Sequence, residues 1–600
     1  MSVKTQVIMD LECYTNYFLI SLLRPSDDKI VSFDFSGENT LDVDRIESIL
    51  ANHEIITFNG NGYDIPMLGL ALKGANTYKL KTASDELIVG GLKPYQFNNK
   101  YEIPELEINH IDLIEVAPSK TGLKIYGGRL HCEKMQDLPY EPDKILTNEE
   151  MLLVKTYCGN DLIITKLLLA DLTPQIDLRR NMSNQYKIDL RSKSDAQIAE
   201  EVIKAEIKRK TKCNLSKPKP PETFIYQAPE FIKFKSTRLN EVLKIFTTRP
   251  FVVNNKNGKI EMPKEVLTLK VGLGESTYQL GMGGLHSTES CVNHIADKNT
   301  ILCDVDVTSY YPSIILNCGL YPKQLGEKFL DVYKELVDAR IAGKREKNMV
   351  IADSLRIVIN GSFGKLGSRY SALYSPELMI QVTVTGQLSL LMLVEALENN
   401  GVPVVSGNTD GIVVKCSRAK ESVFKATVLQ WETDTGFNME RTDYSGIYSR
   451  DVNNYIAVKS DGKVKSKGCF KLGGLQKNPQ NEICIIAVIK YITEGASLED
   501  TIAACKDITK FVTVRKVEGG AVKGNRLLGK AIRWYYAKNE RGTINYKTNN
   551  NTVPRTIGAK PIMDLPSIFP TDVDYHWYIE EARDLLSDIN LEKKGQLSLF

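Results

Sequence analysis

The stretch VVSGNTDGIVVK, residues 404–415, holds one carboxylate, Asp410, between two runs of β-branched residues. Runs of Val and Ile of this length are typical of strands, and the Gly, Asn and Asp residues between them are typical of a tight turn. The pattern therefore predicts a β-hairpin with Asp410 at its tip. A lone Asp in such a turn is usually only a turn residue, so a chemical role requires a partner elsewhere in the chain.

A candidate partner lies upstream, in TILCDVDVTSYYPSII, residues 300–315. The first half of this segment predicts a strand with Asp306 near its end, and the Tyr-Pro step then begins a helical turn. Two carboxylates at strand ends can share divalent cations that activate an attacking oxygen and hold a leaving phosphate. Mg²⁺ suits this task because it prefers oxygen ligands. Asp304 and Asp306 face the same side of the strand, so their spacing alone does not choose between them.

The bulk composition is that of an ordinary globular protein, with 42% hydrophobic and 25% charged residues in a chain of 600. This length corresponds to roughly two to four domains. The net charge of +3 says little about partners, so a nucleic-acid signal must come from local clusters. Eleven scattered cysteines without a CxxC pair favour reduced thiols in the cytoplasm. We find no signal-peptide pattern and no stretch that approaches the ~20 apolar residues of a membrane span.

Secondary-structure patterns divide the chain into regions. The first part alternates strand and helix patterns, as an α/β domain does. The Lys-rich segment 203–222 ends in Pro and is typical of an inter-domain connector. Its basic residues either follow a phosphate backbone or form a solvated linker. Beyond it we predict helices over 327–360 and 377–398, and mostly helical structure after 476.

The hairpin and its partner resemble the polymerase motifs of family B DNA polymerases. DVTSYYPSII, which begins at Asp306, resembles DxxSLYPSII, and the turn around Asp410 resembles YGDTDS. The segment RIVINGSFG, residues 356–364, resembles KxxxNSxYG. The resemblance implies that Asp306 and Asp410 are the catalytic, metal-binding aspartates. It also implies that the incoming nucleotide is bound by Tyr311, Arg340, Lys344, Arg356 and Asn360.

The roles of these nucleotide-binding residues differ. Tyr311 matches the family tyrosine that stacks under the incoming sugar and excludes a 2′-hydroxyl. Arg340 and Lys344 are one helical turn apart, which allows both cations to reach one triphosphate. Arg356 stands where the family has Lys; it keeps the charge and can grip phosphate with two donors. It is a poorer proton donor to leaving pyrophosphate, because its pKa stays very high.

Two further departures concern the acids and the nucleotide helix. Asn408 replaces the first Asp of YGDTDS, which the resemblance makes the less essential one. The site then has one negative charge fewer. In RIVINGSFG, Gly361 replaces Ser and Phe363 replaces Tyr.

Two other segments resemble DNA-contacting motifs of the same family. YQLGMGGLHS, residues 278–287, resembles the Gly-rich template-contact motif, which implies contacts from Gly283 and Gly284. NNYIAVKSDGKVKSKG, residues 453–468, resembles the primer-grip strand and its KxKG continuation, although Asn replaces the usual Lys at its start. The residues carried over from the grip are Tyr455, Lys467 and Gly468.

A second set of acids lies near the N-terminus. Asp10 and Glu12 share one face at the end of a predicted strand, Asp64 closes NGNGYD, and YCGND places Tyr157 and Asp161 on one helix face. Acids from three segments repel one another, so they cluster at low electrostatic cost only when cations neutralise them. Two-metal phosphodiester hydrolysis is the chemistry that such a cluster allows. Tyr157 would orient the attacking water.

The three segments resemble the motifs DxE, NxxxYD and YxxxD of DEDDy proofreading exonucleases. The resemblance makes Asp10, Glu12, Asp64 and Asp161 catalytic metal ligands and Asn59 a DNA-binding residue. We interpret Asp112, a further acid after an apolar strand, as structural.

The chain ends in EKKGQLSLF, which resembles the QLxLF peptide that docks on bacterial sliding clamps. The residues involved would be Gln596, Leu597, Ser598, Leu599 and Phe600. Gln596 would hydrogen-bond at the rim of the clamp, and the apolar side chains would fill pockets. A tail folded back onto the protein is the alternative. Binding to a bacterial clamp implies a bacterial or bacteriophage enzyme, and the compact chain favours a phage.

The resemblance implies a multidomain α/β and α+β fold in which an RNase H-like exonuclease domain is followed by a right-hand polymerase. The gaps between the polymerase motifs are too short for the insertions of protein-primed relatives, so an ordinary primer is expected. The expected domains are exonuclease 1–175, connector and first part of the palm 176–300, palm 301–326, fingers 327–375, palm with primer grip 376–475, thumb 476–590 and clamp-binding tail 591–600.

We therefore expect a template-directed, primer-dependent DNA polymerase with a 3′–5′ proofreading exonuclease that replicates a phage genome. It would use two Mg²⁺ ions per site, with Mn²⁺ as a substitute. Its partners would be primer–template DNA, dNTPs and the host sliding clamp, with no membrane, for a monomer in the bacterial cytoplasm. Two alternatives stay open: a nuclease with a degenerate, DNA-holding polymerase domain, and a primase-like polymerase that needs no primer.

Overall fold

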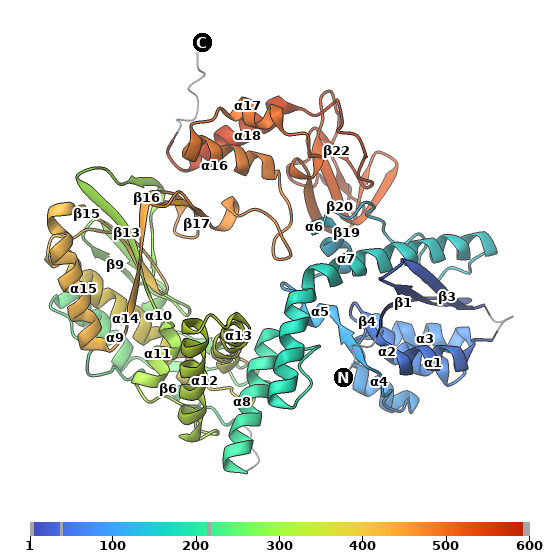
Figure 1. Cartoon of the computed structure of the whole chain (residues 1–600), viewed down its shortest axis with the longest axis horizontal. Coiled ribbons are helices and arrows are strands. Elements are labelled where there is room, and N and C mark those ends of the chain that lie inside the picture. The colour runs from blue at the N-terminus through green and yellow to red at the C-terminus, as the bar shows by residue number, and fades with distance from the viewer. Residues whose placement is uncertain (1–4, 37–39, 213–217, 592–600) are drawn as a thin grey trace. The chain divides into compact units, whose positions relative to one another are not determined.

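The computed structural model describes residues 5–36, 40–212 and 218–591, and it divides the chain into two compact units. Each unit is built around its own large β-sheet, so the chain is a multidomain α/β protein (Figure 1). The first unit comprises Met1–Ser194, Leu472–Cys484 and Glu499–Ile579, and the second comprises Asp195–Lys471, Ile485–Leu498 and Glu580–Phe600.

The main sheet of the first unit has five strands in the order β3-β2-β1-β4-β5. β1 (Gln6–Tyr14) pairs antiparallel with β2 (Tyr17–Arg24), which pairs antiparallel with β3 (Lys29–Phe35). On its other side, β1 runs parallel to β4 (Glu54–Thr57), and β4 runs parallel to β5 (His110–Asp112). This order and these directions are those of an RNase H-like sheet, as expected for the N-terminal region.

Helices cover both faces of this sheet, because successive residues of β1 point to opposite sides. Val7, Met9 and Leu11 join a core with one set of helices, whereas Ile8 joins a core with the other. The first set is α1 (Val43–Asn52), α2 (Asp64–Leu72), α3 (Thr77–Ile88) and α4 (Pro94–Tyr101). The second is α5 (Leu113–Val116), α6 (Leu123–Arg129) and the 39-residue α7 (Asn148–Tyr186).

The first unit also contains a four-stranded sheet of order β21-β19-β20-β22. Its long strands are β19 (Thr513–Lys523) and β20 (Arg526–Tyr536), so the prediction of mostly helical structure after 476 is wrong there. Register shifts between Lys516 and Val522 interrupt the alternation that marks a strand in sequence. The neighbouring elements are α16 (Glu482–Glu494), α17 (Leu498–Ala504), β21 (Asn545–Tyr546), β22 (Ala559–Pro561) and α18 (Tyr575–Asp588).

The second unit is built on a ten-stranded sheet whose main path is β18-β17-β16-β13-β15-β14-β11-β10-β9, with β12 paired to β16. The predicted hairpin is confirmed as β14 and β15, and the predicted upstream strand as β13. The strands are β9 (Lys270–Leu273), β10 (Ser276–Gln279), β11 (His286–Ser287), β12 (Ser290–Ile295), β13 (Thr300–Val307), β14 (Val404–Asn408), β15 (Gly411–Ser417), β16 (Met439–Asp451), β17 (Asn454–Lys459) and β18 (Val464–Ser466).

Helices α8 (Asp195–Thr211), α12 (Lys328–Arg345) and α13 (Met349–Leu366) pack against one another in the second unit (Figure 1). Over 203–211 the Lys-rich sequence, which we expected to be an inter-domain connector, forms the second half of α8. Its Lys210 forms an ion pair with Glu335 of α12.

Helix α14 (Pro376–Asn399) is long and apolar enough to cross a membrane, a possibility that the sequence analysis missed. Most of its apolar window is buried inside the protein, as in the core helix of a globular fold. α11 (Tyr310–Asn317), which follows β13 directly, packs against it.

Candidate active sites

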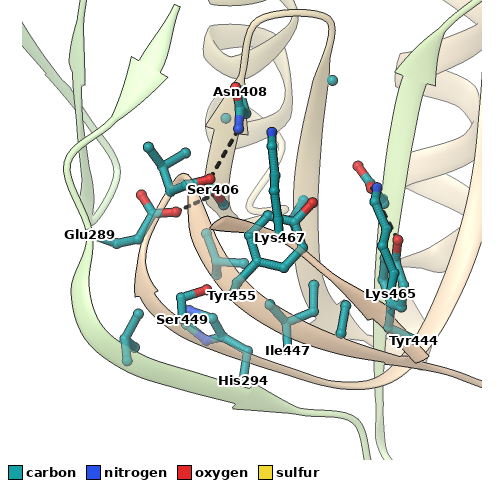
Figure 2. Close-up of a pocket in the computed structure, with 18 of the residues that line it drawn as sticks. Glu289, His294, Ser406, Asn408, Tyr444, Ile447, Ser449, Tyr455, Lys465 and Lys467 are labelled. Atoms are coloured by element: carbon teal, nitrogen blue, oxygen red, sulfur yellow. Dashed lines mark hydrogen bonds and ion pairs between the residues drawn. The ribbon is translucent and has the colours of Figure 1, made fainter. Parts of the chain in front are cut away.

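Strand pairing brings Asp306 and Asp410 together at one edge of the second unit's sheet. In the register between β13 and β15, Asp306 lies opposite Gly411, and the Val307 N–H donates to the Asp410 carbonyl oxygen at 2.7 Å. Both acids line one pocket. Figure 2 labels other residues of its lining, among them Asn408, Tyr455 and Lys467. Gly411 leaves room for this arrangement, because an added Cβ would overlap Asp306 Oδ1.

The turn that carries Asp410 is held by its neighbours. Thr409 has a φ of 58°, in the left-handed region that non-glycine residues seldom adopt. The Asn408 side-chain amide donates to the Val452 carbonyl oxygen at 3.0 Å, and Thr409 Oγ1 donates to Asn408 Oδ1 at 3.1 Å. A carboxylate at 408 could accept but could not donate. The amide at this position therefore fastens the turn.

The electrostatics of this pocket suit a divalent cation. Burial, followed by the negative charges of Asp304 and Asp410, raises the pKa of Asp306 to about 6. Burial also raises the pKa of Asp410, which Lys467 and Lys465 partly oppose. Crowded carboxylates of this kind are stabilised in their charged form when a cation joins them. Oxygen donors are also the ligands that Mg²⁺ prefers. Asp306 and Asp410 are the residues that would hold it.

Asp304, the acid that spacing could not separate from Asp306, has partners of its own. Tyr444 Oη donates to Asp304 Oδ2 at 3.3 Å, and Lys465 Nζ lies 3.6 Å from the same oxygen. Among the described residues Asp306 has no ion-pair partner. This difference favours Asp306 as the metal ligand. Lys465 was not among the predicted site residues, although its alternation with Lys467 in KVKSKG was the available signal.

A second pocket of about 300 Å³ opens beside Asp410. The Tyr311 and Phe363 rings lie 4.3 Å apart between centroids, and Tyr311 Oη donates to the Gly283 carbonyl oxygen at 2.7 Å. Arg340 Nη1 donates to Ser309 Oγ at 3.0 Å. Its Nε is buried and has no hydrogen-bond partner in the described part of the chain. The pocket is lined by Tyr311, Arg340, Asn360, Phe363 and Asp410, among others.

Two predicted nucleotide-binding residues do not line this pocket. Lys344 lies one turn after Arg340 on α12, as expected, but outside the lining. Arg356 lies on α13, where its Nη2 is 3.4 Å from Asp353 Oδ1. Burial lowers the pKa of the Arg340 guanidinium, and the charge of Arg356 lowers it further, so the two guanidinium groups are close enough to repel each other. Arg340 and Arg356 are thus close, whereas the proposed role of Lys344 rests on helical spacing alone.

The predicted DNA-binding residues of the second unit surround the two acids. Tyr455 of β17 and Lys467 line the pocket of Asp306, and Lys467 Nζ lies 5.9 Å from the Tyr455 ring centroid. Gly468 has a φ of 63°. The N–H of the next residue, Cys469, donates to Asn454 Oδ1 at 2.7 Å. The Asn residues that replace Lys in the grip therefore include one with a local structural contact.

The two glycines of the template-contact segment differ. A Cβ added at Gly284 would lie 2.8 Å from Thr409 Oγ1 and 3.0 Å from Thr409 Cα, in the turn that carries Asp410. A Cβ added at Gly283 would meet nothing within 4 Å among the described residues. Gly284 is thus needed for close packing, whereas Gly283 presents an open backbone.

In the first unit, the predicted nuclease acids converge between the sheet and α7. Asp10 and Glu12 lie within β1, on the face that α7 covers, and not at the end of the strand as the sequence suggested. Tyr157 and Asp161 come from α7, and Asp64 begins α2. Burial raises the pKa of Asp64, and the charges of Asp10, Asp112 and Glu12 raise it further. Burial and the charge of Asp10 likewise raise the pKa of Glu12.

Two residues that the motifs did not reveal complete this cluster. Lys124 of α6 forms an ion pair with Asp161, and its Nζ lies 4.2 Å from the Tyr157 ring centroid. Burial lowers the pKa of Lys124 to about 8, although the charges of Asp10 and Glu12 oppose the shift. Cys158 Sγ donates to Asp10 Oδ2 at 3.5 Å. A buried cation among four acids marks a place where divalent cations would be favourable.

The loop before Asp64 is fastened by Asp112. Asp112 Oδ1 accepts from the Asn59 N–H at 2.7 Å, and Oδ2 accepts from the Asn61 N–H at 2.9 Å. Asn59 has a φ of 68°, so these bonds hold a strained turn. Asp112 therefore has the structural contacts that we expected. The clamp-binding residues Gln596–Phe600 lie outside the described residues.

Comparisons with known proteins find DNA polymerases. No family model matches. DNA polymerase 2 of Saccharolobus solfataricus is 23% identical over 278 residues, 45% of this chain and 39% of the relative. DNA polymerase 1 of the same organism is 28% identical over 123 residues, 20% of this chain and 14% of the relative. DNA polymerase 1 of Pyrococcus abyssi is 20% identical over 215 residues, 34% of this chain and 26% of the relative. The alignments thus span less than half of each relative.

Among solved structures, the family B DNA polymerase of Pyrobaculum calidifontis is similar, with a TM-score of 0.41 and 14% identity. The match covers 98% of this chain and 78% of that one.

Proposed function

We propose that this chain is a template-directed, primer-dependent DNA polymerase of the family B type. The observation that carries the proposal is the convergence of Asp306 and Asp410 beside a pocket lined by Tyr311, Arg340 and Asn360. Acids for cations, a buried guanidinium for phosphate and an aromatic floor for a sugar are the parts that nucleotidyl transfer needs. The names of the similar archaeal proteins support the same reaction.

In the proposed reaction the primer 3′-hydroxyl attacks the α-phosphate of a dNTP, and pyrophosphate leaves. Two Mg²⁺ ions, held by Asp306 and Asp410, would supply charge neutralisation and an activated oxygen. Arg340, which lines the pocket, binds the triphosphate through its guanidinium, and Arg356 adds a second cation. Tyr311 and Phe363 present a rigid surface to the sugar. Positioning and electrostatic stabilisation would account for most of the rate.

We propose a second activity, 3′–5′ exonucleolysis, for the first unit. Asp10, Glu12, Asp64 and Asp161 would hold two divalent cations, and Tyr157 would orient the attacking water. The buried cluster with Lys124 at its centre supports this proposal. Asn59, held by Asp112 at the edge of the site, would contact the DNA strand.

The proposed partners follow from these activities. They are primer–template DNA, dNTPs and, through Gln596–Phe600, a bacterial sliding clamp. The proposed setting is phage replication in the bacterial cytoplasm by a monomer that binds no membrane, and Mn²⁺ would substitute for Mg²⁺.

Two variants separate the activities. We expect Asp410→Asn to abolish dNTP addition, because it removes a metal ligand, and to leave degradation of single strands intact. Asp10→Ala combined with Glu12→Ala should do the reverse. Both are measured on one labelled primer–template and one labelled single strand with Mg²⁺, and thermal unfolding of each variant against wild type controls for folding of the mutated unit.

The outcomes also distinguish the alternatives. A wild-type protein that degrades DNA but adds no nucleotide would identify a nuclease with a degenerate polymerase domain. Synthesis on a bare single-stranded template would identify a primase-like enzyme. Retained synthesis by Asp410→Asn would refute the proposed site.

A further inference from the structure

The pocket of Asp306 is enclosed by strands that are distant from one another in the sheet. Lys465 belongs to β18 and Asp304 to β13, and β17 and β16 lie between these strands in the sheet order. Three steps across a flat sheet are roughly 14 Å, well beyond the reach of a Lys side chain. Lys465 Nζ nevertheless lies 3.6 Å from Asp304 Oδ2. The sheet therefore curls, and the ion pair crosses its concave side.

Two further contacts support this crossing. Tyr444 of β16, an intervening strand, donates from Oη to Asp304 Oδ2 at 3.3 Å. Lys465 Nζ lies 6.0 Å from the Tyr455 ring centroid. Figure 2 shows Lys465 and Tyr444 together on one side of the pocket, with Glu289 and Ser406 on the other. The Asp304 side chain is 11% exposed, so its charge depends on these partners.

The Asp304–Lys465 ion pair links β13, which carries Asp306, to the hairpin that carries the predicted DNA-binding residues. Asp304 is two residues before Asp306 and faces the same side of β13. Lys465 is two residues before Lys467, whose charge lowers the pKa of Asp410. The hairpin of β17 and β18 also carries Tyr455. A change in the distance between the β17–β18 hairpin and β13 would therefore move Tyr455 and Lys467 relative to the two metal-binding acids.

We propose that the Asp304–Lys465 ion pair is a positioning device that holds the β17–β18 hairpin against β13 and so sets the distance between the primer end and the metal-binding acids. The proposal rests on the polymerase function proposed above. It makes Lys465 and Asp304 positioning residues that act through Tyr455, Lys467 and Asp306. Misplacement of reacting groups by about 1 Å can cost ~100-fold in rate, so a cross-sheet pair of modest strength can have a large kinetic effect.

The test compares Lys465→Met, Lys465→Arg and a control, Lys463→Met. Lys463 lies in the same hairpin, but its side chain is 79% exposed and its Nζ is 3.0 Å from Asp461 Oδ2. Single-nucleotide addition is measured at saturating DNA over a range of dNTP concentrations. We expect Lys465→Met to lower kcat about tenfold or more with little change in KM for dNTP. Lys465→Arg should recover most of the rate, and Lys463→Met should match wild type.

A double-mutant cycle distinguishes positioning from direct contact of Lys465 with DNA. If the pair acts as a unit, Asp304→Asn should lower kcat as Lys465→Met does, and the double variant should be no worse than the poorer single variant. If Lys465 only contacts DNA, Lys465→Met should weaken primer–template binding whereas Asp304→Asn should not. The second result would overturn the proposal.

Lys465→Arg and Lys463→Met control for folding, because they change the same unit and the same hairpin, and their thermal unfolding should match that of Lys465→Met. Single-strand degradation by the same preparations checks only the other unit. Equal rates for Lys465→Met and Lys463→Met would refute the positioning role, provided that Asp410→Asn is inactive in the same assay. Synthesis by Asp410→Asn would instead refute the proposed function, so the two failures are distinguishable.

Discussion

At position 408 an amide stands where the resembling motif has a carboxylate, and its hydrogen bonds explain the exchange. The Asn408 amide donates to the Val452 carbonyl oxygen, and its own oxygen accepts from Thr409. The residue thus fastens the turn that presents Asp410. The missing negative charge of the motif is replaced by a structural bond and not by another ligand.

We predict that Asn408→Asp lowers the stability of the protein and does not raise its rate of primer extension. The carboxylate would face the Val452 carbonyl oxygen without a proton to donate, at a cost of about 1–3 kcal/mol for a lost hydrogen bond and an unpaired acceptor. Denaturant unfolding should show the lower stability, and primer extension should be slower than wild type. Faster extension at unchanged stability would show that the site lacks a charge and that the amide bond is dispensable.

The raised pKa of Asp306 predicts how the metal-free protein responds to pH. Burial and neighbouring acids raise this pKa from 3.8 to about 6. Between these values the unfolded chain loses the proton first, so the free energy of unfolding should fall as pH rises from about 4 to about 6. Asp306→Asn removes this contribution.

The measurement is the unfolding midpoint in chelator for wild type and Asp306→Asn across that pH range. The acids of the first unit are common to both proteins and cancel in the comparison, whereas Asp304 and Asp410 lose the neighbouring charge of Asp306 in the variant, so the difference reports these three acids together. We expect the variant to gain stability relative to wild type as pH rises, and Mg²⁺ to restore the wild type near neutral pH. A constant difference between the two proteins would contradict the shifted pKa.

At the scale of elements, the Gly-rich segment and the β14–β15 hairpin form one packed assembly. The Thr409 N–H donates to the Leu285 carbonyl oxygen at 2.8 Å, and Gly284 lies against Thr409. Tyr311 Oη reaches the same segment at the Gly283 carbonyl oxygen. The segment therefore links the floor of the nucleotide pocket to the turn of Asp410.

We predict opposite results for alanine at the two glycines of this segment. Gly284→Ala should displace Thr409 and lower kcat for dNTP addition strongly, about 10- to 100-fold, because it moves Asp410. Gly283→Ala has room for its methyl group and should leave kcat near wild type, while it weakens DNA binding if DNA approaches that backbone closely. Equal losses of kcat from both substitutions would contradict this division. Single-nucleotide addition and primer–template titration measure the two effects.

At the scale of the whole molecule, the two candidate sites belong to different units, each with its own sheet and core. Separate cores explain why one set of substitutions should remove synthesis and another set degradation. The proposed clamp-binding residues, Gln596–Phe600, lie outside the described residues.

We predict that deletion of Gln596–Phe600 spares short primer extension. The active-site residues are unchanged, whereas the apolar anchors for a clamp are lost. Synthesis on a long template with a loaded bacterial clamp should therefore fall to the clamp-free level in the deleted form only. Leu599→Ala with Phe600→Ala is the matched control for chain length. Equal stimulation of the full-length and deleted proteins would exclude the tail as the docking peptide.

Several elements were predictable because their signals are local. Runs of Val and Ile on both sides of a Gly/Asn turn predicted the β14–β15 hairpin, and the apolar pattern predicted α14. The strands β19 and β20 were missed because a bulge interrupts their alternation and an apolar helix precedes them. The Lys-rich half of α8 was predicted to be a connector because a Lys-rich composition indicates solvent exposure, which a linker and the exposed face of a packed helix share.

The sequence by itself indicated which short segments supply the acids of each candidate site, because strands, turns and helical spacing are properties of short segments. Only the tertiary structure decided the partners of those acids: Lys124 among the nuclease carboxylates, Lys465 against Asp304, and Asn408 against Val452. These contacts join residues that are far apart in the chain or in the sheet order. They depend on how helices pack and how the sheet curls, which no local pattern specifies.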